Sequence, residues 1–356
     1  MELTEAKASL DNIIKKGRVH LYKPIQIAEI LHRDRVQKDI NLSDLETYRT
    51  KSKKWRDVIC VPFLGRTSTS SAKYQDDIFN LTAVPPSALV ALGAENRRKN
   101  GIVESYVYDM FKERYGQMST ALNYARDAEK ETFDLEEFIN LFWSEPGLKR
   151  SLDKIYEIVV YSLFSVIVEE LDVQIEVSLN PSKIAVLKEF ESFAEKVICI
   201  NTQNTSFKSP ANINRVGVTN AADRGLDMWA NFGPAIQIKH LSLNEKLAEE
   251  IVTTVTSDRI VIVCKDSEES VIKSLLNQLG WKSRIQSIIT ESELIDWYNK
   301  ALKGVFANSI GTKLLKSISD EIMLEFPSSD NSEFMEFYKE RGYDKLVDID
   351  WKTPNT

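Results

Sequence analysis

The spacing of apolar residues divides the chain into a helical first part and a mixed second part. Up to about residue 145, apolar side chains recur every three or four positions, as at Leu10, Ile13 and Ile14, which predicts helices. From Pro146 onward, helical spacing alternates with short runs that have the period of two expected of strands. The pattern therefore predicts an α/β fold with a mainly helical N-terminal region.

The second part of the chain predicts a definite order of elements. Helices are predicted at 148–171, 181–197, 244–254, 268–279 and 291–302, with strands at 173–177, 260–264 and 285–289 and a hairpin at 225–239. A polar stretch at 201–222 leads into the hairpin, and two more helices are predicted at 310–324 and 332–340. This divides the chain into a mainly helical region at 1–145, an α/β domain at 146–305 and a C-terminal helical extension at 306–356.

The hairpin, DRGLDMWANFGPAIQIKHL at 223–241, concentrates the candidate chemistry. Side chains alternate along a strand, so Ile236 and Ile238 are expected in the core, with Gln237 and Lys239 on the surface that carries Asp227. Oxygens of an aspartate and a glutamine can hold a hard cation such as Mg²⁺, which keeps several waters. A lysine beside them can orient a water for attack on a phosphodiester. The alternative is an amphipathic hairpin whose polar residues only face water.

Each residue of this candidate site has an expected role. Asp227 is predicted to end the first hairpin strand and to be the main metal ligand, with Asp223 as the competing aspartate. Gln237 supplies a second ligand, and the backbone carbonyl of Ile238 a third. Lys239 holds the attacking water and offsets charge that builds on the phosphate.

Two sets of residues are candidates for DNA contact. The run YRTKSKKWR interleaves basic residues with aromatic ones and is suited to phosphates; its basic members are Arg49, Lys51, Lys53, Lys54 and Arg56. The polar stretch before the hairpin offers a lysine for phosphate and the amide and guanidinium groups that pair with bases, namely Lys208, Asn212, Asn214, Arg215 and Asn220. The alternatives are an exposed helix face and a surface loop whose asparagines serve turns.

Net charge at first argues against a nucleic-acid partner, because the 356 residues carry −7 at pH 7. The charge is uneven: residues 1–100 hold 18 Lys and Arg against 12 Asp and Glu, a net of +6, which leaves −13 for the remainder. A basic face is therefore expected in the N-terminal part.

Cysteine usage and hydropathy set the expected environment. Three widely spaced cysteines, Cys60, Cys199 and Cys264, predict neither a disulfide framework nor a zinc site, and we expect them reduced and largely buried. No run reaches the roughly 18 apolar residues that span a bilayer, and the N-terminus is too polar for a secretory signal. We therefore expect a cytoplasmic protein with no membrane partner.

Two resemblances sharpen this interpretation. An acid on one strand followed by acid-x-lysine on the next resembles the PD-(D/E)XK nuclease signature, although Gln237 replaces the usual second acid and leaves one charge fewer for the metal. Longer segments are far more specific and together look like the HaeII family of type II restriction endonucleases over most of the chain. They are KKGRVHLYKPIQIAEILHRDRV at 15–36, DLETYRTKSKKWRD at 44–57, PGLKRSLDKIYEIVVYSLFS at 146–165, NRVGVTNAADRGLDMWANFGPAIQIKHLSL at 214–243 and DRIVIVCKDSEE at 258–269.

The family resemblance implies a function. It implies Mg²⁺-dependent, sequence-specific cutting of double-stranded DNA, with RGCGCY as the first guess for the target. It also implies the α-β-β-β-α-β core of the superfamily, a mixed central sheet flanked by helices, and a helix-borne Glu157 that reaches the metal through water. The alternative for Glu157 is a surface glutamate that makes a salt bridge. A palindromic target calls for a homodimer. A cognate DNA methyltransferase shares the target but need not bind the protein.

Two other functions remain as alternatives. One is a catalytically inactive DNA-binding protein on a nuclease scaffold, with Gln237 as a relic of lost metal affinity. The other is an unrelated metal-dependent hydrolase of small phosphoesters. A digest of one plasmid of known sequence with Mg²⁺ separates all three.

Overall fold

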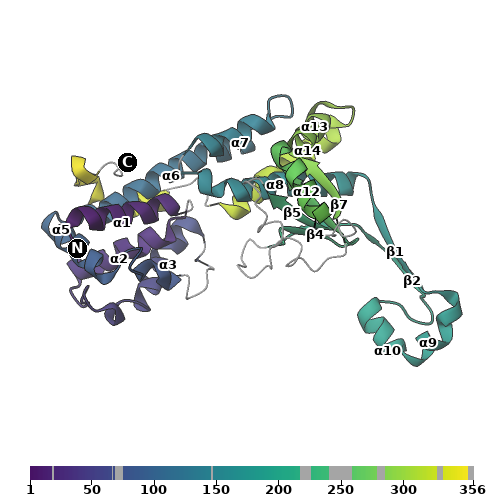
Figure 1. The fold of residues 1–356 in the computed structure, drawn as a ribbon, viewed down its shortest axis with the longest axis horizontal. Coiled ribbons are helices and arrows are strands. Elements are labelled where there is room, and N and C mark those ends of the chain that lie inside the picture. The colour runs from purple at the N-terminus through teal and green to yellow at the C-terminus, as the bar shows by residue number, and fades with distance from the viewer. Residues whose placement is uncertain are drawn as a thin grey trace. The chain divides into compact units, whose positions relative to one another are not determined.

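The computed structural model forms two compact units (Figure 1). The residues that the structure describes are 1–17, 20–65, 67–68, 75–145, 147–216, 226–239, 259–278, 285–326 and 332–351. What we call the helical unit comprises the described parts of 1–158 and 318–356, and the sheet unit those of 159–216 and 223–317. The boundaries of these two units fall within helices α8 and α14.

The helical unit is built around a buried helix, α2. Its apolar residues Ile25, Ile27 and Ile30 are fully buried, because neighbouring helices cover it on several sides. The helices of this unit, including those that the boundaries cut, are α1 Leu3–Lys16, α2 Tyr22–Val36, α3 Lys51–Leu64, α5 Pro86–Arg98, α6 Ile102–Arg126, α7 Leu135–Ser144, α8 Leu152–Glu170, α14 Ala307–Glu325 and α15 Ser332–Glu340.

The C-terminal residues belong to the core of this same unit. Phe334, Tyr343 and Trp351 are buried in the cluster that α1, α2 and α6 also form. The ring of Phe334 meets that of Phe63 edge-on at a centroid distance of 5.2 Å. The segment predicted as a C-terminal extension thus packs, from residue 318 onward, into the helical unit.

A buried carboxylate, Glu104 on α6, links distant parts of the helical unit. It accepts hydrogen bonds from Arg35 at 2.9 Å through two nitrogens, from His32 Nδ1 at 2.9 Å, and from Asn96 and Tyr343 at 2.6 Å. Burial alone would raise the pKa of Glu104, but the hydrogen bonds from Arg35 and His32 outweigh it and hold the pKa at about 2. The carboxylate is therefore ionised and ties α2, α5 and η6 (Tyr343–Lys345) to α6.

A mixed five-stranded sheet forms the centre of the sheet unit. Its strand order is β3-β4-β5-β6-β7, in which β3, β4 and β5 are antiparallel neighbours while β5, β6 and β7 run parallel. The strands are β3 Ile213–Arg215, β4 Met228–Ala230, β5 Ala235–Lys239, β6 Ile260–Cys264 and β7 Ile285–Thr290. Every residue of β6 is buried, as expected for an all-apolar strand in the parallel part of a sheet.

Helices on the sheet are fixed by caps and by one buried tyrosine. α12 (Asp266–Gln278) connects β6 to β7, and α13 (Glu291–Lys303) begins at a capping box made by Thr290 and Glu293. Tyr298 on α13 donates a hydrogen bond of 2.7 Å to the carbonyl of Val159 on α8. The helix predicted at 244–254 lies outside the described residues.

Strand 173–177, which we expected in the central sheet, is not part of it. Among the described strands, β1 (Gln174–Ser178) pairs with β2 (Ser206–Pro210) in a separate antiparallel ribbon, and β3 is the edge strand of the central sheet, beside β4. The residues of β1 alternate between exposed and half-buried, so neither face of the ribbon has the apolar surface that a sheet interior requires.

The predicted helix at 181–197 is broken into short turns at the end of this ribbon. They are η4 Pro181–Lys183, α9 Ile184–Glu189, α10 Glu191–Phe193 and the π-helical turn η5 Ala194–Ile198. We call residues 171–211 the arm and residues 179–205 its tip; Figure 1 shows the ribbon with α9 and α10 at its end.

Candidate active site

Asp227 and Gln237, the first two predicted metal ligands, lie against each other. The Nε2 of Gln237 donates a 2.7 Å hydrogen bond to Oδ2 of Asp227, and the same oxygen accepts a 2.7 Å bond from the backbone N–H of Ile238. Gln237 is 1% exposed, whereas Asp227 is partly accessible. A carboxylate bound by two donors of β5 thus faces partly outward.

Strand register explains why these two residues meet. β4 and β5 pair antiparallel with Met228 opposite Ile236, and one further step of the same register sets position 227 against position 237. The first hairpin strand is shorter than predicted: Asp227 precedes β4 and does not end it. Glycine at position 233, with φ of +121°, allows the turn that joins the two strands.

The remaining predicted members of the site are only partly described. The backbone of Lys239 belongs to β5 and pairs in parallel with Cys264, but its side chain lies outside the described part of the chain. Asp223, the competing aspartate, and Asn220 also lie outside it.

The donor set fits a magnesium ion with many waters better than a closed protein cage. Within the described ranges, no three His, Cys, Asp or Glu side chains come together as a metal site. Mg²⁺ commonly binds one or two carboxylates and keeps several waters, which matches one aspartate with a neighbouring amide. In the observed conformation the NH₂ group of Gln237 faces Asp227. Coordination by its oxygen requires a half-turn of the terminal amide, a torsion with a broad energy profile.

Glu157, the predicted water-mediated ligand, is engaged within the helical unit. Its carboxylate oxygens accept hydrogen bonds of 2.6 and 2.8 Å from Nζ of Lys154, one turn earlier on α8. The side chain is largely buried. The structure therefore gives Glu157 a salt-bridge partner, and its role at the metal stays a prediction.

The basic residues of α3 and its N-terminal approach have three different environments. Lys51 and Lys54 are exposed. Arg49 and Lys53 both contact Asp76, at 3.2 and 2.6 Å. Arg56 does not lie on the surface: it is 1% exposed.

Arg56 is part of an internal hydrogen-bond network. Its guanidinium donates to Gln26 at 3.1 Å, to Gln75 at 3.0 Å and to Asp57 at 2.6 Å. Among these candidates, Lys51 and Lys54 have the accessibility that a phosphate contact needs.

The predicted base-reading stretch enters two different structures. Lys208 lies on β2 of the arm, 3.5 Å from Glu176 on the paired strand. Asn214 and Arg215 form part of β3, beside β4. Asn212 is exposed in the link between β2 and β3.

Asn231 in the hairpin turn holds this link, a role that sequence reasoning missed. Its Oδ1 accepts the N–H of Asn212 at 2.8 Å, and its Nδ2 donates to the carbonyl of Pro210 at 3.1 Å. The only signal in the sequence is an asparagine in a turn, which is common to many turns.

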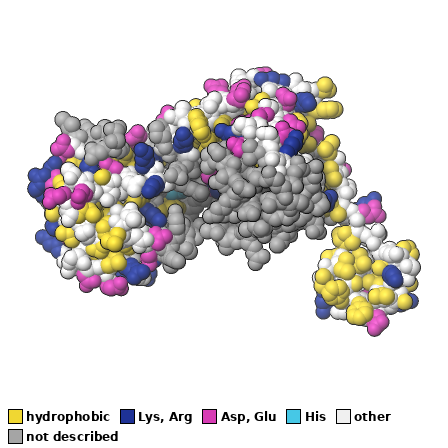
Figure 2. Space-filling model, viewed as in Figure 1, with side chains coloured by type: hydrophobic (Ala, Val, Ile, Leu, Met, Phe, Trp, Pro, Cys, Tyr) yellow, Lys and Arg dark blue, Asp and Glu magenta, His cyan; other side chains and the backbone are white. Residues whose placement is uncertain are grey.

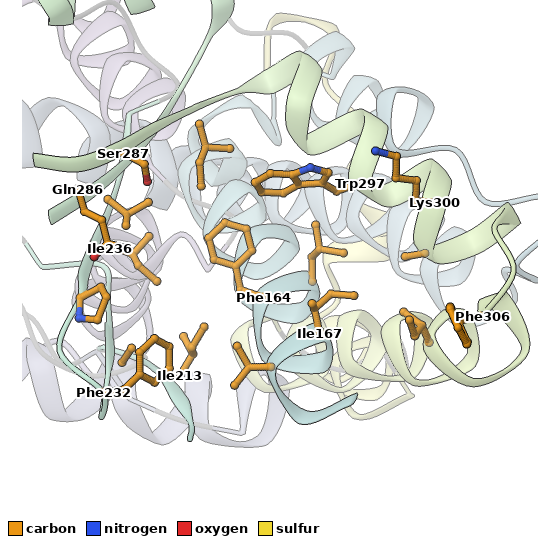
Figure 3. Close-up of a pocket in the computed structure, with 18 of the residues that line it drawn as sticks. Phe164, Ile167, Ile213, Phe232, Ile236, Gln286, Ser287, Trp297, Lys300 and Phe306 are labelled. Carbon is orange, nitrogen blue, oxygen red and sulfur yellow. The ribbon is translucent and has the colours of Figure 1, made fainter. Parts of the chain in front are cut away.

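A cavity of about 780 Å³ in the sheet unit is separate from the carboxylate site (Figure 3). Ile236 of β5, Phe164 of α8 and Trp297 of α13 line it, and Figure 3 shows these side chains around one hollow. Gln237 follows Ile236 and is not part of the lining, because successive side chains of a strand point to opposite faces. The described residues that line the cavity are mostly apolar, and none of them is acidic.

The mixed sheet, with a carboxylate and an amide held together on neighbouring strands, defines an α/β protein with a candidate hydrolase site. The family model of the HaeII restriction endonuclease matches residues 6–343. The chain belongs to this family, so the resemblance expected from the sequence is confirmed, and the protein is a site-specific endonuclease of the restriction type.

Two curated relatives are similar along nearly their whole length. The type II restriction enzyme HaeII of Haemophilus aegyptius is 62% identical over 349 residues, which cover 98% of this chain and 99% of the relative. The type II restriction enzyme NgoBI of Neisseria gonorrhoeae is 56% identical over 348 residues, with 98% and 99% covered. No solved structure matches the chain. In the part of the chain that is described, no helix is both long and apolar enough to cross a membrane.

Proposed function

We propose that this type II restriction endonuclease uses Mg²⁺ to hydrolyse both strands of double-stranded DNA at the palindrome RGCGCY. The observation that carries the proposal is the contact between Asp227 and Gln237 on neighbouring strands, at the position where acid-x-lysine nucleases place their metal ligands. The target is proposed from the family to which the chain belongs. Relatives can read different bases with the same Mg²⁺-dependent hydrolysis, so the target and the chemistry are separate parts of the proposal.

We also propose that the sheet unit is a PD-(D/E)XK core. Helix α8 precedes an antiparallel run of β3, β4 and β5, after which β6 adds in parallel to β5. This is the order helix, three strands and a further strand expected of that core. The second helix of the pattern corresponds to the one predicted at 244–254, outside the described residues.

The proposed chemistry assigns a task to each residue at the hairpin. Asp227, the side-chain oxygen of Gln237 and the backbone carbonyl of Ile238 would hold Mg²⁺, which when bound lowers the pKa of a coordinated water and polarises the phosphate. Lys239 orients the attacking water and offsets the negative charge that builds on the phosphate. Ile238 also positions Asp227 through its N–H, which fixes one carboxylate oxygen.

DNA is proposed to contact both units. Lys51 and Lys54 offer exposed ammonium groups for phosphates. In the sheet unit, Asn212 and Arg215 lie in the link and strand that precede Asp227 along the chain, a position from which we propose base contacts. Cutting both strands of a palindrome requires two active sites, so the proposed working form is a homodimer.

A plasmid of known sequence provides the test. With Mg²⁺ the protein should cut at discrete sites whose mapped ends give the target, and Asp227→Ala or Lys239→Ala should abolish cutting while DNA binding persists. Asp296→Ala, at an exposed aspartate of α13, is the matched control and should cut normally. Full activity of both site variants, or smears at every sequence, would contradict the proposal.

Gln237 favours one second candidate, a DNA-binding protein that has lost cleavage. An amide contributes no charge to a metal site, so affinity for Mg²⁺ is lower than with two carboxylates. This alternative predicts specific retention of DNA without cutting under Mg²⁺ or Mn²⁺. Cleavage by the wild-type protein rules it out.

A further inference from the structure

The tip of the arm exposes more apolar surface than its own fold can bury. Its core consists of Leu187, Ala194 and Ile200, with Leu179 and Phe207 packed against them. Outside this small cluster, several apolar side chains face the surface, among them Val186, Phe190, Phe193, Val197 and Ile198. Figure 2 shows hydrophobic side chains gathered over the tip.

The two phenylalanines are the largest contributors to this surface. Phe190 is 56% and Phe193 57% exposed. A phenylalanine buries about 150–250 Å² when fully covered, so these two alone leave roughly 200 Å² of apolar area in water. They border a groove of about 460 Å³ that Val186, Leu187 and Ile198 also line. The tip thus carries both projecting aromatic side chains and a hollow of suitable chemistry to receive them.

The charge of the tip argues against a polyanionic partner. Residues 179–205 contain three lysines and three glutamates, so the tip is neutral overall. Nucleic-acid surfaces need a local excess of Lys and Arg, and interface cores are depleted in charge and enriched in aromatic residues. The tip has the composition of a protein–protein contact.

The ribbon that carries the tip gives a second reason to expect that a partner covers the arm. β1 and β2 form a two-stranded sheet whose residues are exposed or half-buried throughout. A two-stranded ribbon alone is marginally stable in water. Contact with a partner would stabilise the arm as well as its tip.

We infer that the tip is an isologous contact with the tip of a second copy of this chain, in which Phe190 and Phe193 of each copy enter the groove of the other. A surface with both knob and groove is self-complementary under a two-fold axis. Several hundred Å² from each tip, with the flanking ribbon, approaches the roughly 800 Å² per partner of a specific interface. The inference rests on the proposed function in one respect: two-strand cleavage of a palindrome supplies the reason for a two-fold dimer.

Sedimentation velocity of the full-length protein tests this contact. The wild type should be dimeric at micromolar concentration. Phe190→Asp/Phe193→Asp should raise the dimer dissociation constant at least about 100-fold, because each substitution acts twice across a two-fold interface and removes aromatic anchors. Leu81→Asp/Val347→Asp, which changes two exposed apolar residues of the helical unit in the same way, should stay dimeric.

Cys199 provides a reporter that needs no destabilising variant. It is exposed at the end of η5, while Cys60 and Cys264 are buried. A short bismaleimide should join two wild-type chains through Cys199, and Cys199→Ser should remove the covalent dimer. If the double phenylalanine variant fails to fold, this cross-linking experiment decides whether the two tips are in contact.

Two outcomes overturn the inference: a monomeric wild type with and without DNA, or a double variant that stays dimeric. If the double variant stays dimeric and also loses DNA affinity, the tip is assigned to DNA. Cleavage assays on the same samples separate this inference from the proposed function. If the protein cuts at discrete sites but stays dimeric after the tip substitutions, the tip contact is contradicted and the proposed function is not. If the chains are cross-linked through Cys199 but the protein cuts no DNA, the proposed function is contradicted and the tip contact is not.

Discussion

The amide of Gln237 and the carboxylate of Asp227 form a 2.7 Å hydrogen bond across neighbouring strands. Asp227 is therefore held from β5, by one side chain and one backbone N–H, although it precedes β4 along the chain. Under the proposed function, such a carboxylate is already in position before the metal binds, which reduces the entropy that binding must overcome. An amide next to it avoids the repulsion that a second carboxylate would create in an ion-free site.

This relationship predicts the behaviour of Gln237→Glu. Two carboxylates in hydrogen-bond distance repel each other unless a cation or a shared proton lies between them, so the variant should have a lower Tm than wild type without metal. Added Mg²⁺ should raise its Tm by more than it raises that of wild type, because the ion binds the folded state. Differential scanning fluorimetry across a Mg²⁺ titration measures both shifts. Equal shifts in the two proteins would show that position 237 does not contact the ion.

Lys54 and Arg56 should separate DNA binding from stability. Lys54→Ala should weaken DNA binding and reduce the slope of log affinity against log salt by about 1, with unchanged stability, because an exposed lysine contributes through phosphate contact. Arg56→Ala should lower the free energy of unfolding by about 1–3 kcal/mol, because it leaves Gln26 and Gln75 without their buried donor. Fluorescence anisotropy and urea denaturation provide the two readouts. If Arg56→Ala weakened DNA binding without lowering stability, and Lys54→Ala lowered stability without weakening DNA binding, Arg56 would be assigned to the DNA contact.

Acid should weaken the helical unit through Glu104. Its pKa in the folded protein is about 2, below the ordinary value of 4.5, so its contribution is complete above pH 4.5 and is lost as the pH falls toward 2. The depression corresponds to about 3 kcal/mol at most. We expect the stability difference between wild type and Glu104→Gln to shrink over that interval in urea titrations. Glu113→Gln, at an exposed position of the same helix, is the control and should show no such convergence.

Tyr298→Phe should loosen the attachment of α13 to α8. The substitution removes the hydroxyl that donates to the carbonyl of Val159 at a buried position and should lower the free energy of unfolding by about 1 kcal/mol. Urea denaturation of the full-length protein measures this loss. Trp297→Phe, at the exposed neighbour, is the matched aromatic substitution; a loss as large there as at Tyr298 would show that packing, not the hydrogen bond, is responsible.

The sequence by itself determined the elements with a strong period and the family of the protein. The apolar, β-branched run at 260–264 predicted a buried strand, which the structure confirms, and alternation in β5 placed Gln237 on the opposite side of the strand from Ile236. Segments spread over most of the chain identified a HaeII-type restriction endonuclease, and the comparisons confirm it.

Only the tertiary structure decided which elements pair and which side chains are buried. Strand 174–178 lies in a separate ribbon and not in the central sheet. Arg56 is buried and donates hydrogen bonds to Gln26 and Gln75. Cys199 is exposed, although we expected it to be buried. The physical reason is common to all three. Periodicity along the chain fixes the local conformation and its apolar face, but the surface that covers that face comes from residues far away in the sequence, and the amino-acid pattern of one segment carries no record of them.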